Sequence, residues 1–314
     1  METKIKRGLG IITDLNLINP ISKNKSSLLI EGKCKESNIE QDLFCVSNTK
    51  KDSTHFFDEI HFNNCENKLL EISGDVELKL KVRSAIQLTL RIEKDANITL
   101  TIDGNANEFL SSGLFIQIFE NIKVNLNIKS ELNGLQNYLR IEQEQEANSV
   151  VNVSLQIKST NQAMLFYKSN IIGLNSVLDK RIFIKAKNSQ IDSEVSTIHE
   201  VPNTKSNMIV NGTLENSKII NENTITITKE ASGVQGFEHS KFIILDDKSN
   251  AISIPNLVIF NEDVSCSHGS SISSIDEEEL FYLQSRGITK QDSINLITEG
   301  LKSQVIDHLN IKTD

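Results

Sequence analysis

The chain has 314 residues, a formal net charge of −9 and a hydrophobic fraction of 38%. The negative charge and the lack of a basic stripe disfavour nucleic-acid binding by phosphate neutralisation, which needs clustered Lys and Arg. Tryptophan is absent and aromatic residues make up 5% of the chain, so the core has to be built mainly from Ile, Leu and Val. Such a core favours strands, and the length is compatible with one large domain or two.

Cysteine usage and the start of the chain bear on its compartment. The cysteines are too irregularly spaced for a typical disulfide framework: Cys34, Cys45, Cys65 and Cys266. The apolar run after the basic start is interrupted by Thr13, Asp14 and Asn16, so it does not resemble a secretion signal. No stretch is apolar for long enough to span a bilayer. We therefore expect a soluble, cytoplasmic protein without a membrane or nucleic-acid partner.

Residues 1–66 show no regular pattern. Short apolar runs at residues 28–30 and 42–46 stand among polar residues. The sequence predicts an N-terminal segment of short strands and loops.

Residues 67–273 alternate between apolar and polar side chains. The alternating apolar positions include Val76, Leu78, Leu80, Val82, Leu88, Leu90, Ile92, Ile98, Leu100, Ile102, Val124, Leu126, Ile128, Val151, Val153, Leu155, Ile157, Ile182, Ile184, Ile225 and Ile227. A period of two indicates strands that bury one face.

Two architectures accommodate many short strands joined by Asn, Asp, Ser and Gly: an antiparallel sandwich or barrel, and a parallel β-helix. Hairpin signals are few, namely Asp103-Gly104, Asn133-Gly134 and Asn211-Gly212. Since a β-helix tolerates Asn-rich corners and needs no hairpins, we predict a mainly β protein with a parallel β-helix core over residues 67–273.

Residues 274–314 are predicted to form a short helical C-terminal subdomain. Ser274 and Glu277 have the spacing of a capping box, which indicates a helix over residues 275–286 that stops at Gly287. Thr289 begins a second helix. The apolar side chains of that helix have helical spacing on one face: Ile294, Ile297, Leu301, Val305 and Leu309.

Searches for chemistry find no phosphate-binding loop, dinucleotide fingerprint, zinc-protease motif or nucleophile elbow. The acidic run at residues 276–279 is best explained by the helix dipole. His55 and His61 near Cys65 match no zinc spacing, so we expect them to be surface residues. His199 and His239 have no nearby partner in the sequence and are expected to be structural or solvated.

Cys266 and His268 are two residues apart, so in an extended segment both side chains point to the same face. A thiolate and an imidazole are suitable donors for iron or zinc. Two ligands do not complete a tetrahedral site, so any metal needs further donors from elsewhere or from a partner chain. The alternative is that Cys266 is simply a small buried hydrophobe.

The stretch NLVIFNEDVSCSHGSSISSIDEEELFYLQSRGIT, residues 256–289, resembles the C-terminal signature of the SufB/SufD family of iron-sulfur cluster assembly scaffold proteins. It is closer to the SufD branch, whose members carry a Cys-Ser-His-Gly segment, an acidic helix start and a Leu-Phe-Tyr-Leu-x-Ser-Arg-Gly-Ile run. The preceding KFIIL at residues 241–245 and IPNL at residues 254–257 follow the order of that family.

The resemblance implies a right-handed parallel β-helix followed by a helical tail. It implies a scaffold that is not an enzyme, pairs with a SufB-type subunit through the β-helix and docks a SufC-type ABC ATPase through the tail. His268, as a metal ligand, and Cys266 match the cluster interface, with an iron-sulfur cluster held only transiently and no stably bound cofactor. The residues that match the docking helix are Leu280, Phe281, Tyr282, Leu283, Arg286 and Gly287.

The sequence departs from the family pattern at Asn256 and at the Ser270-Ser271 pair. The chain is also shorter than typical members, so the N-terminal domain is expected to be reduced. Two alternatives stay open: a β-helix enzyme that cleaves carbohydrates, which needs clustered acids on one face, and a degenerate family member with a purely structural role.

Overall fold

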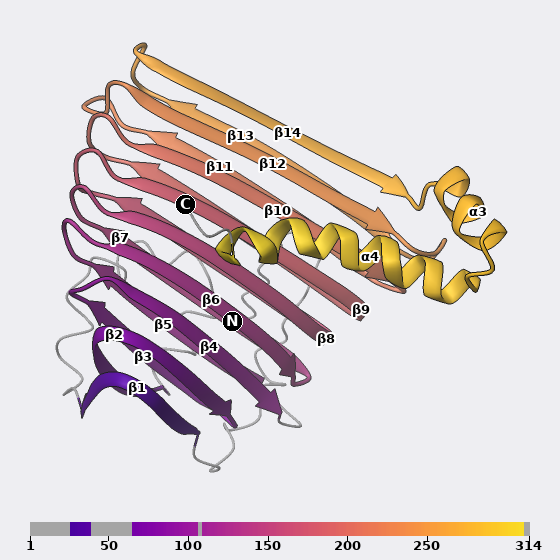
Figure 1. Cartoon of the computed structure of the whole chain (residues 1–314), viewed down its shortest axis with the longest axis horizontal. Helices are drawn as coiled ribbons and strands as arrows, with labels where there is room; N and C mark the ends of the chain where they lie inside the picture. The colour runs from indigo at the N-terminus through magenta and orange to yellow at the C-terminus, as the bar shows by residue number, and fades with distance from the viewer. Residues whose placement is uncertain (1–25, 39–64, 106–108, 311–314) are drawn as a thin grey trace, which may run out of the picture.

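A computed structural model describes residues 26–38, 65–105 and 109–310. It confirms a mainly β fold in which parallel strands stack into a β-helix, followed by helices at the C-terminus (Figure 1). The strands are β1 (Ser27–Asn38), β2 (Glu66–Val82), β3 (Ala85–Ile92), β4 (Ala96–Asn105), β5 (Phe109–Ile118), β6 (Lys123–Asn133), β7 (Gln136–Gln145), β8 (Val150–Ile171), β9 (Val177–His199), β10 (Lys205–Glu215), β11 (Lys218–Ile227), β12 (Val234–Ile244), β13 (Asn250–Ile259) and β14 (Val264–Ser274).

The strands form two faces of one continuous sheet. Face A runs from part of β2 through β4, β6, β8, β9, β10 and β12 to β14, and face B runs from the rest of β2 through β3, β5, β7, β8, β9 and β11 to β13. Every described ladder from β2 onward is parallel, so the Asn-Gly and Asp-Gly pairs do not form hairpins. Asp103-Gly104 and Asn211-Gly212 lie inside β4 and β10.

The corners between the faces depend on asparagine. Asn121, Asn148, Asn175 and Asn203 all have positive φ and follow one another at intervals of 27, 27 and 28 residues, which is one coil of the helix. Asparagine tolerates this left-handed conformation better than other residues with a Cβ. The Asn148 amide also donates to Asn121 at 3.0 Å, and Asn175 donates to Asn148 at 3.2 Å. The corners therefore stack as ladders of amide hydrogen bonds.

The core lies between the two faces and changes in character along the helix. One inward column of face A passes in register through Val76, Ile98, Leu126, Val153, Lys180, Met208, Glu238 and His268. Its first four side chains are buried aliphatics. From β9 onward the same column carries Lys180, Glu238 and His268, with only Met208 apolar, so this column becomes more polar toward the C-terminal coils.

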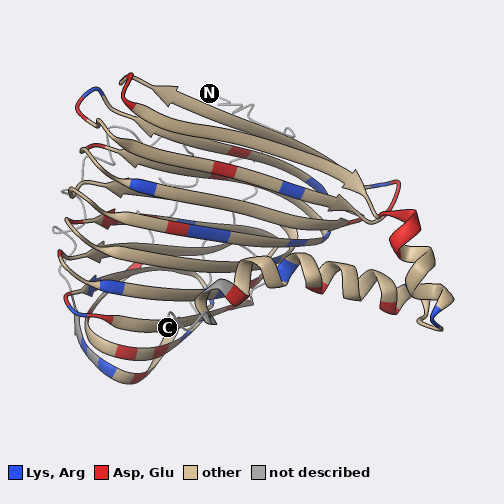
Figure 2. Ribbon diagram, turned by 45° about the horizontal axis from the view of Figure 1, so that its top comes forward, with Lys and Arg blue, Asp and Glu red and all other residues tan. Residues whose placement is uncertain are grey.

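The two ends of the β-helix differ. At the N-terminal end, β1 pairs antiparallel with most of β2, from Lys68 to Lys81 with one irregularity, and covers its edge with a strand that carries Glu31, Lys33 and Lys35. At the C-terminal end, no described strand pairs with the outer edges of β13 and β14. Neither of these last strands contains Lys, Arg, Asp or Glu. Figure 2 shows the same contrast between the charged coils and the uncharged final strands.

The tail consists of α3 (Glu277–Ser285), α4 (Lys290–Ile306) and η3 (Asp307–Asn310). The predicted Ser274 cap is wrong: Ser274 ends β14, and the Asp276 side chain accepts from the amides of Glu278 and Glu279 instead. β14 continues through Ser274, so the helix begins two residues later than a Ser274 cap requires. Gly287 ends α3 with φ +85, as predicted, and Thr289 caps α4 by accepting from the Asp292 amide.

The predicted apolar face of α4 is only partly buried. Leu301 and Val305 pack against Phe183 and Ile243 on the outside of face A, with Ile297 at the edge of this cluster. The Arg181 side chain also donates to the backbone oxygen of Gln304 at 3.0 Å. These contacts attach α4 to the β-helix, whereas α3 projects to the side, past the tip of β14 (Figure 1).

Candidate functional site at the uncovered end of the β-helix

Cys266 and His268 lie on β14, the last strand of face A. Their register partners on β12 are Gly236 and Glu238. Val264 and Cys266 pack against the core. His268 follows at the same alternation and is exposed because no further coil covers it. The two side chains therefore share the inward face, as their spacing predicts.

Cys266 is a half-buried free thiol, and it packs against Gly236, which has no side chain. A Cβ on Gly236 would lie 3.4 Å from Cys266 Sγ and 3.2 Å from Ile225. Burial raises the pKa of the Cys266 thiol. A raised pKa favours the neutral thiol, which is less reactive as a nucleophile or metal ligand than the thiolate. In the isolated chain Cys266 is thus packed as a small apolar group.

Glu238 lies directly beneath His268 and was not among the sequence candidates. Its side chain is 4% exposed, and Oε1 accepts from the Asn223 amide at 2.7 Å. The other oxygen, Oε2, is buried with no partner at hydrogen-bond geometry. Burial raises the pKa of Glu238, a shift opposed in part by Asn223 and by the backbone of Gly269. The sequence does contain a signal for Glu238: it is an acidic residue at a position where the alternation of β12 predicts an inward side chain.

A second buried group lies deeper in the interior. Lys180 is fully buried, and its Nζ donates to Ser169 Oγ at 3.1 Å and to the backbone oxygen of Ser196 at 2.9 Å. Burial lowers the pKa of Lys180 to about 7. Burial, together with the charge of Lys180, lowers the pKa of His199 to about 4.

Among the other candidate residues, His199 is structural. The sequence suggested no nearby partner for it, but the structure shows two. Its ring nitrogens lie 2.7 Å from Thr204 Oγ1 and 2.8 Å from Ser206 Oγ, both buried. His239 is exposed on the outer face of β12, as expected of a solvated residue. His55 and His61 lie outside the described residues, and Cys65 is half-buried with Sγ 3.5 Å from Asn67 Oδ1.

Of the predicted docking residues, Leu280, Phe281, Tyr282 and Leu283 lie on α3, and Arg286 and Gly287 follow directly after it. α3 has no buried residue, and Phe281 and Tyr282 are 72% and 56% exposed. Leu280 and Leu283 are half-buried. The guanidinium of Arg286 lies 5.2 Å from the centre of the Tyr282 ring. The helix therefore presents two aromatic side chains next to its acidic first turn.

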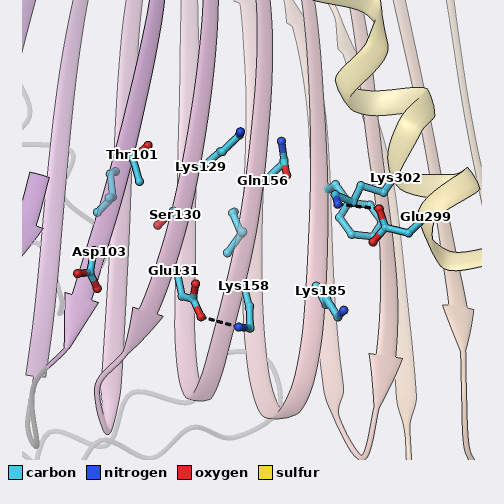
Figure 3. A pocket seen from close by; sticks show the side chains of 13 residues that line it. Thr101, Asp103, Lys129, Ser130, Glu131, Gln156, Lys158, Lys185, Glu299 and Lys302 are labelled. Carbon is cyan, nitrogen blue, oxygen red and sulfur yellow. Dashed lines mark hydrogen bonds and ion pairs between the residues drawn. The ribbon is translucent and has the colours of Figure 1, made fainter. Parts of the chain in front are cut away.

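A separate groove of about 440 Å³ lies between α4 and the outside of face A (Figure 3). Its carboxylates belong to Asp103, Glu131 and Glu299. Each lies near a basic group: Arg83 is 3.9 Å from Asp103, Lys158 is 2.5 Å from Glu131, and Lys302 is 2.8 Å from Glu299. A glycoside hydrolase needs one carboxyl as proton donor and a second as base or nucleophile. Ion-paired acids do not favour that chemistry here.

Two further findings limit the chemistry of the described residues. No group of three or more His, Cys, Asp or Glu side chains in residues 26–38, 65–105 and 109–310 is arranged to hold a metal ion. In the same part of the chain, none of the helices combines the length and apolarity of a bilayer crossing. Cys266 and His268 alone thus offer an incomplete donor set.

The fold and the site define a class: a parallel β-helix with an uncovered last coil, a Cys-x-His pair on its final strand and a projecting helix. A family profile described as "SUF system FeS cluster assembly, SufBD core domain" matches residues 82–301. The match covers more than half of the chain and includes the site, so the chain belongs to the SufBD family of the SUF iron-sulfur cluster assembly system.

Curated relatives agree with this family. A protein of Staphylococcus epidermidis named "Iron-sulfur cluster assembly SufBD family protein" is 31% identical over 120 residues, which is 38% of this chain and 26% of that protein. Similarly named proteins of Staphylococcus haemolyticus and Staphylococcus aureus are 32% identical over 110 residues, 35% of this chain and 24% of theirs. The alignments therefore span about a quarter of these relatives.

Proposed function

We propose that this chain is a SufD-like scaffold subunit that pairs with a SufB-type subunit through the last coil of its β-helix. The observation that carries the proposal is the contrast between the two ends of the helix. β1 covers the N-terminal end with a charged strand, whereas β13 and β14 leave uncharged edges unpaired. Natural sheets protect exposed edges with charge or a cover, so an unprotected edge favours a strand from another chain.

Apolar exposure supports a partner on the same end. Exposed apolar side chains gather on the last coil: Ile252, Ile254, Val258, Ile259, Phe260 and Ile272. Exposed apolar side chains gathered in this way are typical of interaction sites. Pairing there would enclose Cys266 and His268 between the two scaffolds. In this proposal the partner completes the donor set, and the iron-sulfur cluster is a transient cargo rather than a resident cofactor.

The second part of the proposal assigns α3 to a SufC-type ABC ATPase. Phe281 and Tyr282 are exposed on a helix that buries nothing against the β-helix, and buried aromatic anchors dominate the energy of many interfaces. The chain itself has no phosphate-binding loop, so ATP hydrolysis would be supplied by the partner. We propose that this chain is not an enzyme and acts in the cytoplasm.

Co-expression with the SufB-type and SufC-type proteins of the same organism tests this function. Light scattering of the purified complex should give the mass of an assembly that contains all three chains. Removal of residues 274–314 should abolish ATPase association and leave the scaffold pair intact. Failure to associate with either protein would contradict the proposal. If association is normal but His268→Ala leaves cluster assembly unchanged, the role of the chain is purely structural.

A further inference from the structure

The geometry points to Glu238 and His268 as a pair of ligands for one divalent transition-metal ion at the uncovered end of the β-helix. The inference deepens the proposed function and rests on it only in taking ferrous iron as the physiological ion. It adds a carboxylate, from a different coil, to the Cys-x-His pair that the sequence indicates.

The strand register places the two ligands next to each other. Glu238 and His268 are register partners on adjacent parallel strands and share the inward face. Neighbouring strands lie about 4.8 Å apart. Carboxylate oxygens and imidazole nitrogens bind first-row metals at about 2.0–2.2 Å, so ligands from adjacent strands on one face can reach one ion. His268 is exposed at the last coil, so an ion can reach its imidazole directly, and the buried Oε2 of Glu238 lies on the strand beneath.

The Glu238 carboxylate has one unpaired oxygen. Oε2 of Glu238 is buried without a hydrogen-bond partner, in a side chain that is 4% exposed. Burying an ionised carboxylate is unfavourable unless it is paired or binds a cation. Lys180, the buried cation in the same column, is two coils away with Met208 between them, so it does not pair with Glu238. A metal ion next to Oε2 would supply the missing positive charge.

The Asn223 amide orients the Glu238 carboxylate. Asn223 donates to Oε1 at 2.7 Å, which holds the carboxylate in place and leaves Oε2 for the ion. Fixing one oxygen of a ligand by a hydrogen bond is how proteins orient metal ligands. Both side-chain polar atoms of Asn221 and the oxygen of Asn223 are also buried without partners. Asn221 and Asn223 both lie on β11 at buried, inward positions.

The donor set explains why the site stays incomplete in one chain. Glu238 and His268 are two ligands, fewer than the three acidic, thiol or imidazole groups of an ordinary metal site. The remaining positions face the open end, where a second scaffold subunit is proposed to pair. Carboxylate and imidazole donors suit divalent iron, cobalt and manganese, whereas a thiolate-rich site would favour softer ions.

The test is a titration of the full-length chain with Co²⁺ and, without oxygen, with Fe²⁺. Visible absorption and calorimetry should report one bound ion per chain. Glu238→Gln keeps an oxygen for Asn223 but loses the charge, and His268→Ala removes the imidazole. Each change should weaken binding by about ten-fold or more, the loss typical of disturbed metal sites. Glu222→Gln on β11 and His239→Ala on β12 change exposed side chains that point outward; they are the matched controls and should bind as the unchanged chain does.

Two results would overturn the inference: no binding by the unchanged chain, or binding that Glu238→Gln leaves unaltered. Circular dichroism and thermal unfolding of each variant separate loss of binding from loss of fold. Because the titration uses the isolated chain, it is independent of the proposed partners. Glu238-dependent binding in a chain that associates with no SufB-type subunit would support the metal pair and contradict the proposed function. Normal association without metal binding would do the reverse.

Discussion

The ammonium nitrogen of Lys180 lies 4.4 Å from the centre of the Tyr167 ring, inside the β-helix and away from any solvent. The Tyr167 hydroxyl in turn donates to Gln143 Oε1 at 2.8 Å. A lysine ammonium is attracted to the face of an aromatic ring. Hydrogen bonds from Nζ to Ser169 and to the Ser196 backbone complete its surroundings. No acidic group is among these contacts.

We expect the stability of the protein to rise with pH between about 7 and 10.5. Burial lowers the pKa of Lys180 from 10.5 to about 7 in the folded chain, so within this window the unfolded chain holds one more proton than the folded chain. The free energy of unfolding then increases by up to about 1.4 kcal/mol per pH unit. Urea unfolding at pH 7 and pH 9.5 measures this, and Lys180→Met should remove most of the slope. An equal slope in the variant would contradict the assignment.

Replacing His199 should destabilise the fold. His199→Ala leaves the hydroxyls of Thr204 and Ser206 without their partner and opens a cavity in the core. Lost buried hydrogen bonds and a cavity of this kind cost about 2–4 kcal/mol in total. Denaturant unfolding gives the value. His239→Ala is the control, since His239 is exposed and its loss should change stability by less than about 0.5 kcal/mol.

The corner asparagines predict an order of stabilities. Asn148 has φ 55 and both donates to Asn121 and accepts from Asn175. Asn148→Ala loses the ladder of amide hydrogen bonds and also strains the backbone. The left-handed conformation at this position costs about 1–2 kcal/mol for a residue with a Cβ. Asn148→Gly loses only the ladder. Thermal unfolding should therefore rank the unchanged chain first, glycine second and alanine last. An alanine variant as stable as the glycine variant would show that backbone conformation does not limit this corner.

Docking of the ATPase should depend on Phe281. Phe281→Asp removes an aromatic side chain that is 72% exposed and buries a charge in the proposed interface. Loss of an aromatic anchor costs about 2 kcal/mol or more of binding energy, or about 30-fold in affinity. Pull-down or calorimetry with the SufC-type protein measures it, at an unchanged melting temperature. Leu296→Asp is the matched control, because Leu296 is 53% exposed on α4. Equal binding by both variants would remove α3 from the interface.

Pairing through the last coil should fail when its edge is charged. Ser271→Lys places a cation on β14, and lysine on an edge strand opposes the addition of another strand. We expect the complex with the SufB-type subunit to dissociate on size-exclusion chromatography. Gln235→Lys puts the same charge on the outer face of β12, one strand in from the edge, and should have no effect. Intact pairing in the Ser271 variant would locate the interface elsewhere.

The sequence by itself determined the local structure of this protein. Period-two alternation was enough to place the strands, because the pleat alone decides which side chains share a face. Thr289 and Gly287 marked helix ends for the same reason: their hydrogen bonds and backbone angles involve only residues nearby in the chain. The spacing of Cys266 and His268 likewise put both on one face.

Only the tertiary structure decided which distant residues meet. Glu238 lies beneath His268 because β12 and β14 stack in that register. The register between strands thirty residues apart depends on the length of the coil, and the alternation of apolar and polar residues does not specify that length. The same holds for the cap of α3, where the continuation of β14 through Ser274 moved the helix start to Asp276. Which end of the β-helix is left open also depends on long-range pairing, since β1 covers β2 and nothing described covers β13 or β14.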